Sequence, residues 1–123
     1  MSLTASQRGF TLIELIAILV ILGVLASIAV PKYYDLTRES QNSAALQAVT
    51  EGKARLSMNY AKLFLENATP PGATSLVAAV GASTSVGDYT LNLSVEGVST
   101  IKIKAAGKVG VQGTNSAFWF LPR

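Results

Sequence analysis

The hydrophobic pattern begins with a long apolar segment near the N-terminus. This segment runs from Phe10 to Val30, contains one charged residue, Glu14, and is followed by Pro31. As a helix, its 21 residues would extend roughly 31 Å, which is close to the hydrocarbon thickness of a bilayer. The pattern therefore predicts a helix that enters a membrane.

A second helical pattern follows, from Tyr33 to about Asn67. Apolar residues recur there at three- and four-residue steps on one stripe, and most polar residues lie off it. We expect the stripe to face a sheet, and we expect Pro70 and Pro71 to end the helix because proline cannot continue it. The stripe consists of Leu46, Val49, Leu56, Tyr60 and Leu63.

Beyond Asp88 the hydrophobic period changes to two, which is typical of strands. The pattern predicts a hairpin of residues 91–95 and 101–103 that turns at Glu96 and Gly97, a short strand around Val109 and Val111, and a last strand over residues 117–121. Residues 73–87 are mostly small, and we expect them to form a loop. The expected fold class is α+β, with a long N-terminal helix packed on a small antiparallel meander.

The last predicted strand carries three aromatic residues in succession. Phe118 and Phe120 share one face of that strand, and Trp119 lies on the other. We expect the phenylalanine face to pack on the helix and Trp119 to meet a loop, the surface or a neighbouring subunit.

The chain lacks the residue types that most catalytic sites use. The 123 residues include no histidine and no cysteine, and the seven acidic residues are scattered without metal-ligand spacing. We therefore expect no enzyme activity, no metal and no cofactor. The net charge of +3 is too small to indicate a nucleic-acid or anionic-lipid partner.

One group of residues could still form a basic and aromatic patch. Lys102, Lys104 and Lys108 could lie near Tyr89 and Trp119. Exposed strands commonly carry lysines for solubility and for protection of their edges. We therefore do not expect a nucleic-acid partner.

Glu14 is the feature that a plain membrane anchor does not explain. A carboxylate near the centre of a membrane helix costs roughly 2.5 to 3.5 kcal/mol or more. If a peptidase cut between Gly9 and Phe10, the new amine of Phe10 would lie one helical turn from Glu14 and could pair with it. The same amine could instead pair with Glu14 of a neighbouring chain, which would fix the axial register of packed helices.

The run Gly9-Phe10-Thr11-Leu12-Ile13-Glu14-Leu15, with Gly23 and Pro31 downstream, resembles the processing signature of type IV pilins and type II secretion pseudopilins. The resemblance implies cleavage by a prepilin peptidase after Gly9, N-methylation of Phe10, and a role for Glu14 in assembly. The run Pro31-Lys32-Tyr33-Tyr34-Asp35-Leu36 has a looser similarity to pilins of the mannose-sensitive haemagglutinin type.

The resemblance also implies a division of the chain and a life cycle. The expected parts are a leader (1–9), a membrane and assembly helix (10–31), an amphipathic head helix (32–69), a loop (70–87) and a meander (88–123). The precursor would lie in the inner membrane with a cytoplasmic N-terminus and a periplasmic head, and an inner-membrane assembly platform would build it into an extracellular helical homo-oligomer. Gly23 and Pro31 mark a weak point at which the helix is expected to kink or to extend within a fibre.

Other readings of the N-terminal segment remain open. Ser27, Ile28 and Ala29 offer small residues at the spacing that a signal peptidase reads, so the segment could be a cleaved secretory signal. It could also be an uncleaved anchor whose Glu14 reaches the membrane interface. Within the resembling families, a pilus subunit that serves adhesion, motility or DNA uptake competes with a secretion pseudopilin, and outside them with a membrane-tethered binding module that does not polymerise.

The Gly9/Phe10 junction leads to a direct prediction. The mature protein should begin at Phe10 and carry one added methyl group, which N-terminal mass spectrometry of the native protein would detect. A mature chain that began at Val30 would instead establish a secretory signal.

Overall fold

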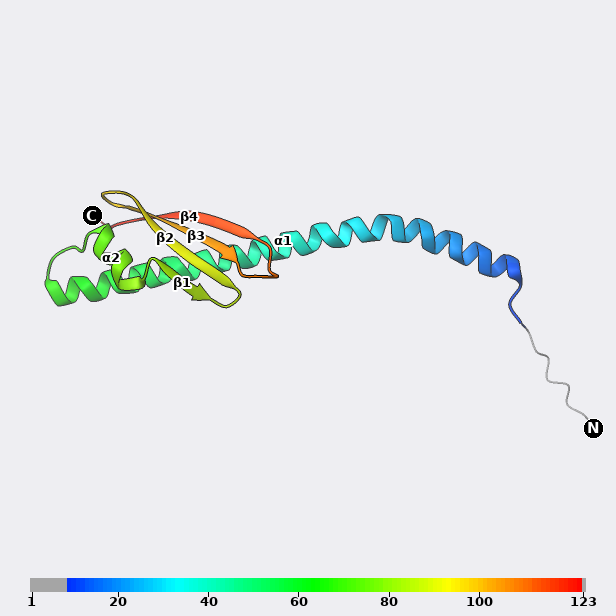
Figure 1. Ribbon diagram of the computed structural model, residues 1–123, viewed down its shortest axis with the longest axis horizontal. Helices are drawn as coiled ribbons and strands as arrows, with labels where there is room; N and C mark the ends of the chain where they lie inside the picture. The colour runs from blue at the N-terminus through cyan, green and yellow to red at the C-terminus, as the bar shows by residue number, and fades with distance from the viewer. Residues whose placement is uncertain (1–8, 123) are drawn as a thin grey trace, which may run out of the picture. The chain divides into compact units, whose positions relative to one another are not determined.

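A computed structural model describes residues 9–122 of the chain (Figure 1). The elements are two helices, α1 (Leu12–Asn67) and α2 (Ala73–Val80), and four strands: β1 (Ser83–Val86), β2 (Tyr89–Gly97), β3 (Thr100–Gly107) and β4 (Thr114–Phe120). The chain divides into two compact units between Leu36 and Thr37, within α1. The second unit, from Thr37 onward, is called the head below. The α+β class expected from the sequence is confirmed.

Helix α1 runs without interruption through both Gly23 and Pro31. Pro31 lacks the N–H that would bond to the carbonyl of Ser27. One turn earlier, the Ser27 hydroxyl donates to the Val24 carbonyl at 2.7 Å. The helix is thus continuous in the free chain, and its extension in a fibre stays a prediction.

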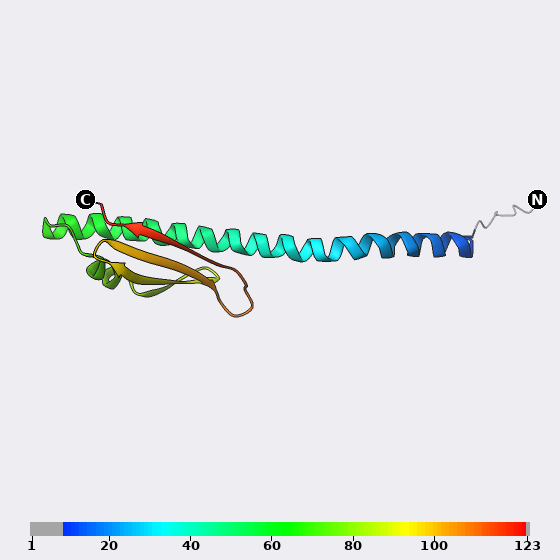
Figure 2. The same ribbon diagram turned by 90° about the horizontal axis from the view of Figure 1, so that it is seen from above.

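The sheet is an antiparallel meander in the order β1-β2-β3-β4. Figure 2 shows the sheet beside the part of α1 that belongs to the head. Leu91 and Leu93 on β2 alternate with polar residues, and Ile101 and Ile103 do so on β3. The register pairs Leu93 with Ile103, so these side chains share one face of the sheet.

The core of the head forms between that face of the sheet and α1. Leu56 is fully buried, as are Leu91, Ile101 and Ile103. Gly52 lies at the closest approach, because a Cβ atom built on it would lie 3.0 Å from Ile103 Cγ2 and 3.2 Å from Leu91 Cδ1. Glycine at this position lets the helix backbone approach the sheet.

The predicted stripe on α1 is wrong at one position. Leu46 is half exposed, whereas the smaller Ala45 and Ala48 are buried. The helix lies so close to the sheet that alanine and glycine fill the centre of the contact, and Leu46 lies to one side of it. Val49 and Leu56 are buried, and Tyr60 and Leu63 pack against the core, as the sequence predicted.

The predicted loop over residues 73–87 is also wrong, because it contains α2 and β1. Helix α2 buries Ala73 and Leu76, and its eight residues are too few to establish a helical period from the sequence. Strand β1 forms a hairpin with β2 in which Val86 pairs with Tyr89 across the Gly87-Asp88 turn. Gly87 has φ +55°, a conformation that favours glycine.

The expected strand at Val109 and Val111 is a turn. The Val111 N–H donates to the Lys108 carbonyl at 2.9 Å, and Gly110 has φ +88°. A hairpin turn replaces the strand because left-handed glycines reverse the chain within this segment, at Gly110, and two residues after it, at Gly113.

The aromatic strand alternates as predicted but presents the opposite face. Ile101 pairs with Trp119, so Trp119 lies on the core side of the sheet and packs against the core. Its indole Nε1 donates to Ser57 Oγ on α1 at 3.2 Å. Phe118 and Phe120 lie on the outer face and are largely exposed.

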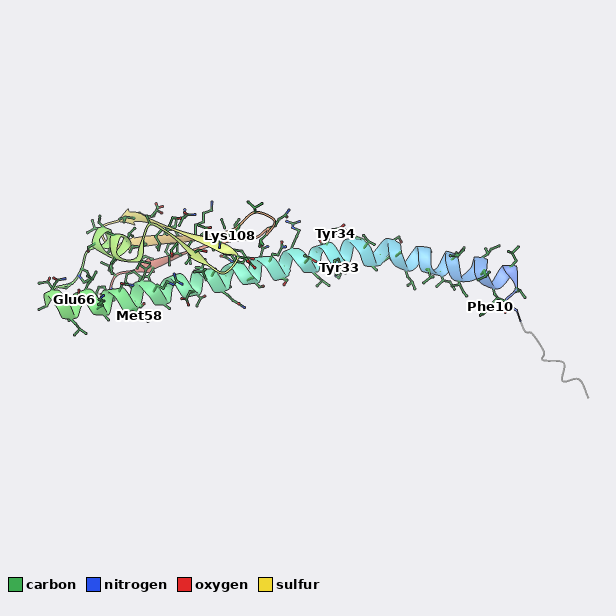
Figure 3. All side chains as sticks on the ribbon, turned by 60° about the horizontal axis from the view of Figure 1, so that its bottom comes forward. Phe10, Tyr33, Tyr34, Met58, Glu66 and Lys108 are labelled. Atoms are coloured by element: carbon green, nitrogen blue, oxygen red, sulfur yellow. The ribbon has the colours of Figure 1, made fainter. Side chains whose placement is uncertain are left out.

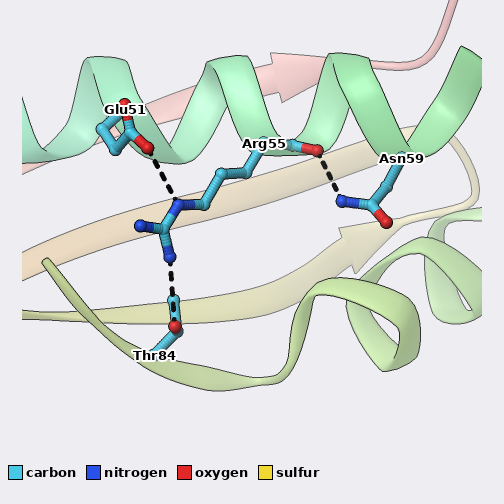
Figure 4. A network of polar contacts seen from close by, with 4 residues as sticks. All are labelled: Glu51, Arg55, Asn59 and Thr84. Carbon is cyan, nitrogen blue, oxygen red and sulfur yellow. Dashed lines mark hydrogen bonds and ion pairs between the residues drawn. The ribbon is translucent and has the colours of Figure 1, made fainter.

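Polar contacts fasten α1 to the sheet at two further places. Arg55 pairs with Glu51 (Nε to Oε1, 3.0 Å) and donates from Nη1 to Thr84 Oγ1 on β1 at 3.3 Å (Figure 4). The Tyr89 hydroxyl donates to the Gln41 carbonyl at 2.8 Å. Side-chain hydrogen bonds thus join the helix to two neighbouring strands, which fixes its position over the sheet.

Two leucines on the same helix test this packing. In a fragment that begins at Arg38, Leu56→Ala should lower the free energy of unfolding by about 2 to 5 kcal/mol, because it leaves a cavity in the core. Leu46→Ala removes the same atoms from a half-exposed position and should cost less than about 1 kcal/mol. Chemical denaturation measures both values, and equal losses would show that the helix face is misassigned.

Candidate assembly site at the start of the first helix

The first turn of α1 is closed by two reciprocal hydrogen bonds. The Thr11 N–H donates to Glu14 Oε2 at 2.9 Å, and the Glu14 N–H donates to Thr11 Oγ1 at 3.3 Å. This is a capping box, in which the side chains at the first and fourth positions satisfy backbone donors that a helix start leaves unpaired. Thr11 therefore starts the helix.

The capping box changes the interpretation of Glu14. Its carboxylate lies in the first turn of α1, near the end of the apolar segment rather than at its centre. A negative charge at a helix N-terminus is favourable because the partial positive charge of the backbone lies there. Part of the free-energy cost of placing this carboxylate in a membrane helix is therefore offset within its own helical turn.

Gly9 and Phe10 precede this turn and are exposed. Among the described residues, a Cβ atom on Gly9 would contact nothing within 4 Å. Packing within residues 9–122 therefore does not require glycine at this position. By contrast, a Cβ atom on Gly52 would lie 3.0 Å from Ile103 Cγ2, so close packing inside the head favours glycine there.

No residue in the described part of the chain covers the first half of the helix that follows. Every residue from 9 to 40 is exposed, including large apolar side chains such as Leu12, Ile13 and Ile28. One window of α1, near the N-terminus, is long and apolar enough to cross a membrane. Each large apolar side chain left in water costs roughly 1.5 to 3 kcal/mol relative to burial, so this helix requires an apolar partner.

The basic and aromatic patch considered from the sequence does not assemble. Tyr89 is buried and Trp119 lies on the core side of the sheet. Lys108 Nζ donates to the Gly87 carbonyl, and Lys102 Nζ lies 5.8 Å from the ring centroid of Phe118. Its five members therefore do not share one surface.

Nothing in the described part of the chain suggests a catalytic or metal centre. Within residues 9–122, no group of three or more acidic residues is placed to hold a metal ion. A polar groove of about 440 Å³ lies in the head between α1 and the start of β4, lined by Glu39, Asn42, Lys104 and residues 114–116. Its single carboxylate and single ammonium offer no proton-transfer pair with a third orienting group.

Comparisons with known proteins bear on the helix start and on the whole chain. Residues 4–30 match the family model described as the prokaryotic N-terminal methylation motif. The chain is 33% identical to the type IV major pilin protein PilE1 of Neisseria gonorrhoeae, over 92% of its own length and 62% of the relative's. It is 35% identical to the fimbrial protein EcpC of Eikenella corrodens, over 90% of its own length and 72% of the relative's. The chain belongs to the type IV pilin family.

The similarity to some other pilins covers only about half of the chain. A fimbrial protein of Pseudomonas aeruginosa is 40% identical over 53% of this pilin and 44% of its own length. The chain spans less than two thirds of the length of the gonococcal pilin. No solved structure matches the chain.

The sequence led to Gly9, Phe10 and Glu14 as candidate site residues in this pilin, but not to Thr11. The structure brings Thr11 and Glu14 together through both hydrogen bonds. The signal was present, since a threonine followed three residues later by glutamate, ahead of an apolar run, is typical of a capping box. The charge of Glu14 led instead to the prediction of an amine as its partner.

Replacing Thr11 tests the capping box. Thr11→Val keeps the shape of the side chain but removes the hydroxyl, which should cost about 1 kcal/mol at the helix start. Amide hydrogen exchange of residues 12–14, followed by NMR in detergent micelles, should then accelerate roughly fivefold. Thr11→Ser retains the hydroxyl and should exchange at the original rate. Equal exchange in all three proteins would remove the capping role of Thr11.

Proposed function

We propose that this pilin is the structural subunit of a type IV pilus and that it polymerises through the first half of α1. The observation that carries the proposal is a capped carboxylate, Glu14, at the start of an apolar helix that the head leaves exposed. A helix of this kind must be covered by lipid or by other subunits. In the precursor the cover is the inner membrane, and in the fibre it is the helices of neighbouring subunits.

Leader removal changes the chemistry beside Glu14. A prepilin peptidase cuts between Gly9 and Phe10, which converts the Phe10 amide into an amine that carries a positive charge, and the same enzyme methylates that amine. The methylation motif over residues 4–30 supports this processing. The exposed glycine, which packing among the described residues does not require, also supports it.

The new amine arises next to a carboxylate that is already oriented. Glu14 Oε2 accepts from the Thr11 N–H, and Thr11 directly follows Phe10. The carboxylate therefore points toward the N-terminal end of its own helix, and its second oxygen can accept from an amine. We infer that this amine belongs to Phe10 of the next subunit in the fibre.

An ion pair between subunits would set the axial register of the fibre. Apolar side chains pack in many registers with similar energy, whereas a charge in apolar surroundings has a large cost unless its partner lies within bonding distance. The pair thus selects one axial offset among many. An inner-membrane assembly platform would supply the work that moves each subunit from lipid into the fibre.

A type II secretion pseudopilin is the second candidate. The same helix start serves both roles, so Glu14 does not separate them. The names of the relatives favour a pilus, since the compared proteins are described as type IV major pilins or fimbrial proteins. A membrane-tethered module that does not polymerise would gain nothing from the carboxylate.

Substitution of Glu14 distinguishes a subunit that polymerises from a membrane-tethered module that does not. Glu14→Ala should insert into the membrane at least as well as the original chain and should still be cleaved after Gly9, yet it should give few or no fibres because the charge partner of Phe10 is lost. Glu14→Gln keeps the shape and hydrogen-bonding capacity of the side chain and removes only the charge, so it should fail in the same way.

Electron microscopy of sheared fibres measures the yield, and immunoblots of the same cells measure subunit level and processing. Unchanged subunit level with lost fibres is the expected result. Full piliation in both variants would refute the role of Glu14 in assembly.

A further inference from the structure

Two adjacent tyrosines follow the apolar segment directly after Pro31. Tyr33 and Tyr34 are 70% and 65% exposed, and their rings meet edge to face with centroids 6.4 Å apart. Lys32 precedes them, so the apolar segment ends in a cation and two phenols. Figure 3 shows the pair on α1, with Phe10 at the other end of the same helical segment.

The spacing between the tyrosines and the capping box matches a bilayer. Nineteen residues separate Glu14 from Tyr33, which corresponds to about 28 Å along a helix. The hydrocarbon core of a bilayer is about 30 Å thick. When Tyr33 lies at one boundary of the hydrocarbon core, Glu14 therefore lies at the other boundary.

We propose that Tyr33 and Tyr34 bind the lipid headgroup layer and set the depth of α1 in the membrane. This inference rests on the proposed function only in that it places α1 in a membrane before assembly. Tyrosine suits the boundary because its ring is apolar and its hydroxyl reaches water and headgroups. Lys32 reinforces the position, since its ammonium group can extend to the phosphate layer.

The depth has a consequence at the opposite end of the helix. With the tyrosines held at one headgroup layer, the Gly9–Phe10 bond lies at or beyond the other boundary, where water and a peptidase can reach it. Glu14 also lies at that boundary, where the cost of a charge falls well below its value at the bilayer centre. Glu14 would meet wholly apolar surroundings only when the subunit leaves the lipid.

The absence of native cysteine allows a clean test of depth. Single cysteines are introduced by Ser27→Cys, Asp35→Cys and Glu39→Cys in the full-length chain, and inner-membrane vesicles are treated with a membrane-impermeant maleimide from the head side. The probe is the lipid bilayer of those vesicles. Position 39 should label fully, position 35 readily and position 27 hardly at all.

The tyrosines are then replaced together in each cysteine variant. Tyr33→Ala with Tyr34→Ala extends the apolar segment toward Leu36, so the helix should slide and labelling at position 35 should fall at least about threefold. Tyr33→Trp with Tyr34→Trp is the matched control and should label like the original chain, because tryptophan favours the same boundary. Labelling at position 39 confirms that the head remains accessible in every variant.

Unchanged labelling at position 35 in the alanine pair would overturn the inference. An equal loss of labelling at position 35 in the tryptophan pair would also overturn the inference. The preference of the side chains for the membrane boundary would then not be the cause of the change in labelling. Normal labelling with lost fibres in the alanine pair would assign the tyrosines to contacts between subunits and leave the proposed function standing. Failure of the proposed function would appear separately, as full piliation in the Glu14 variants with the labelling shift intact.

Discussion

The constraint on which the structure depends is that the first half of α1 has no apolar cover from residues 9–122, the part of the chain that the structure describes. The head buries Ala45, Val49 and Leu56 against the sheet, but every residue from 9 to 40 is exposed. A soluble monomer could not keep so much apolar surface in water. Under the proposed function, this helix meets two apolar environments in turn, lipid and a bundle of like helices. This requirement accounts for a helix whose exposed half is almost purely aliphatic and whose polar groups lie at its ends.

The head, by contrast, must fold without a disulfide around a core that contains few large residues. The chain contains no cysteine. Close packing between α1 and the sheet holds the head together instead. Gly52 lets the helix backbone lie near Leu91 and Ile103, and the hydroxyl of Tyr89 donates to the carbonyl of Gln41. Because the head is small, each of these contacts is a large share of its stability. Its core lies wholly beyond Thr37, so folding of the head does not depend on whether lipid or protein covers the first half of α1.

The sequence predicted the helices and strands whose hydrophobic periods are strong and failed where the period is hidden. The apolar run and the alternation at Leu91, Leu93, Ile101 and Ile103 were sufficient for the fold class. The alternation around Trp119 fixed which aromatics share a face but not which face is inside, since that depends on pairing with Ile101. Residues 73–87 are mostly small and have a weak hydrophobic period, so the sequence did not predict α2 and β1. Because alanine is also small, the sequence likewise did not predict that Ala45 belongs to the buried stripe of the helix. At the candidate assembly site, the charge of Glu14 was visible in the sequence, but its hydrogen bonds with Thr11 required the geometry of the first turn.

The central claim is that Glu14 of one subunit pairs with the Phe10 amine of another. Solid-state NMR on fibres assembled from two labelled populations, one with ¹⁵N at Phe10 and the other with ¹³C at the Glu14 carboxyl, measures that contact directly. The account predicts dipolar coupling between the two labels in the mixed fibres, at the separation of a direct ion pair, within about 4 Å between nitrogen and oxygen. Coupling seen only when both labels are in the same subunit, or none in either sample, would contradict it.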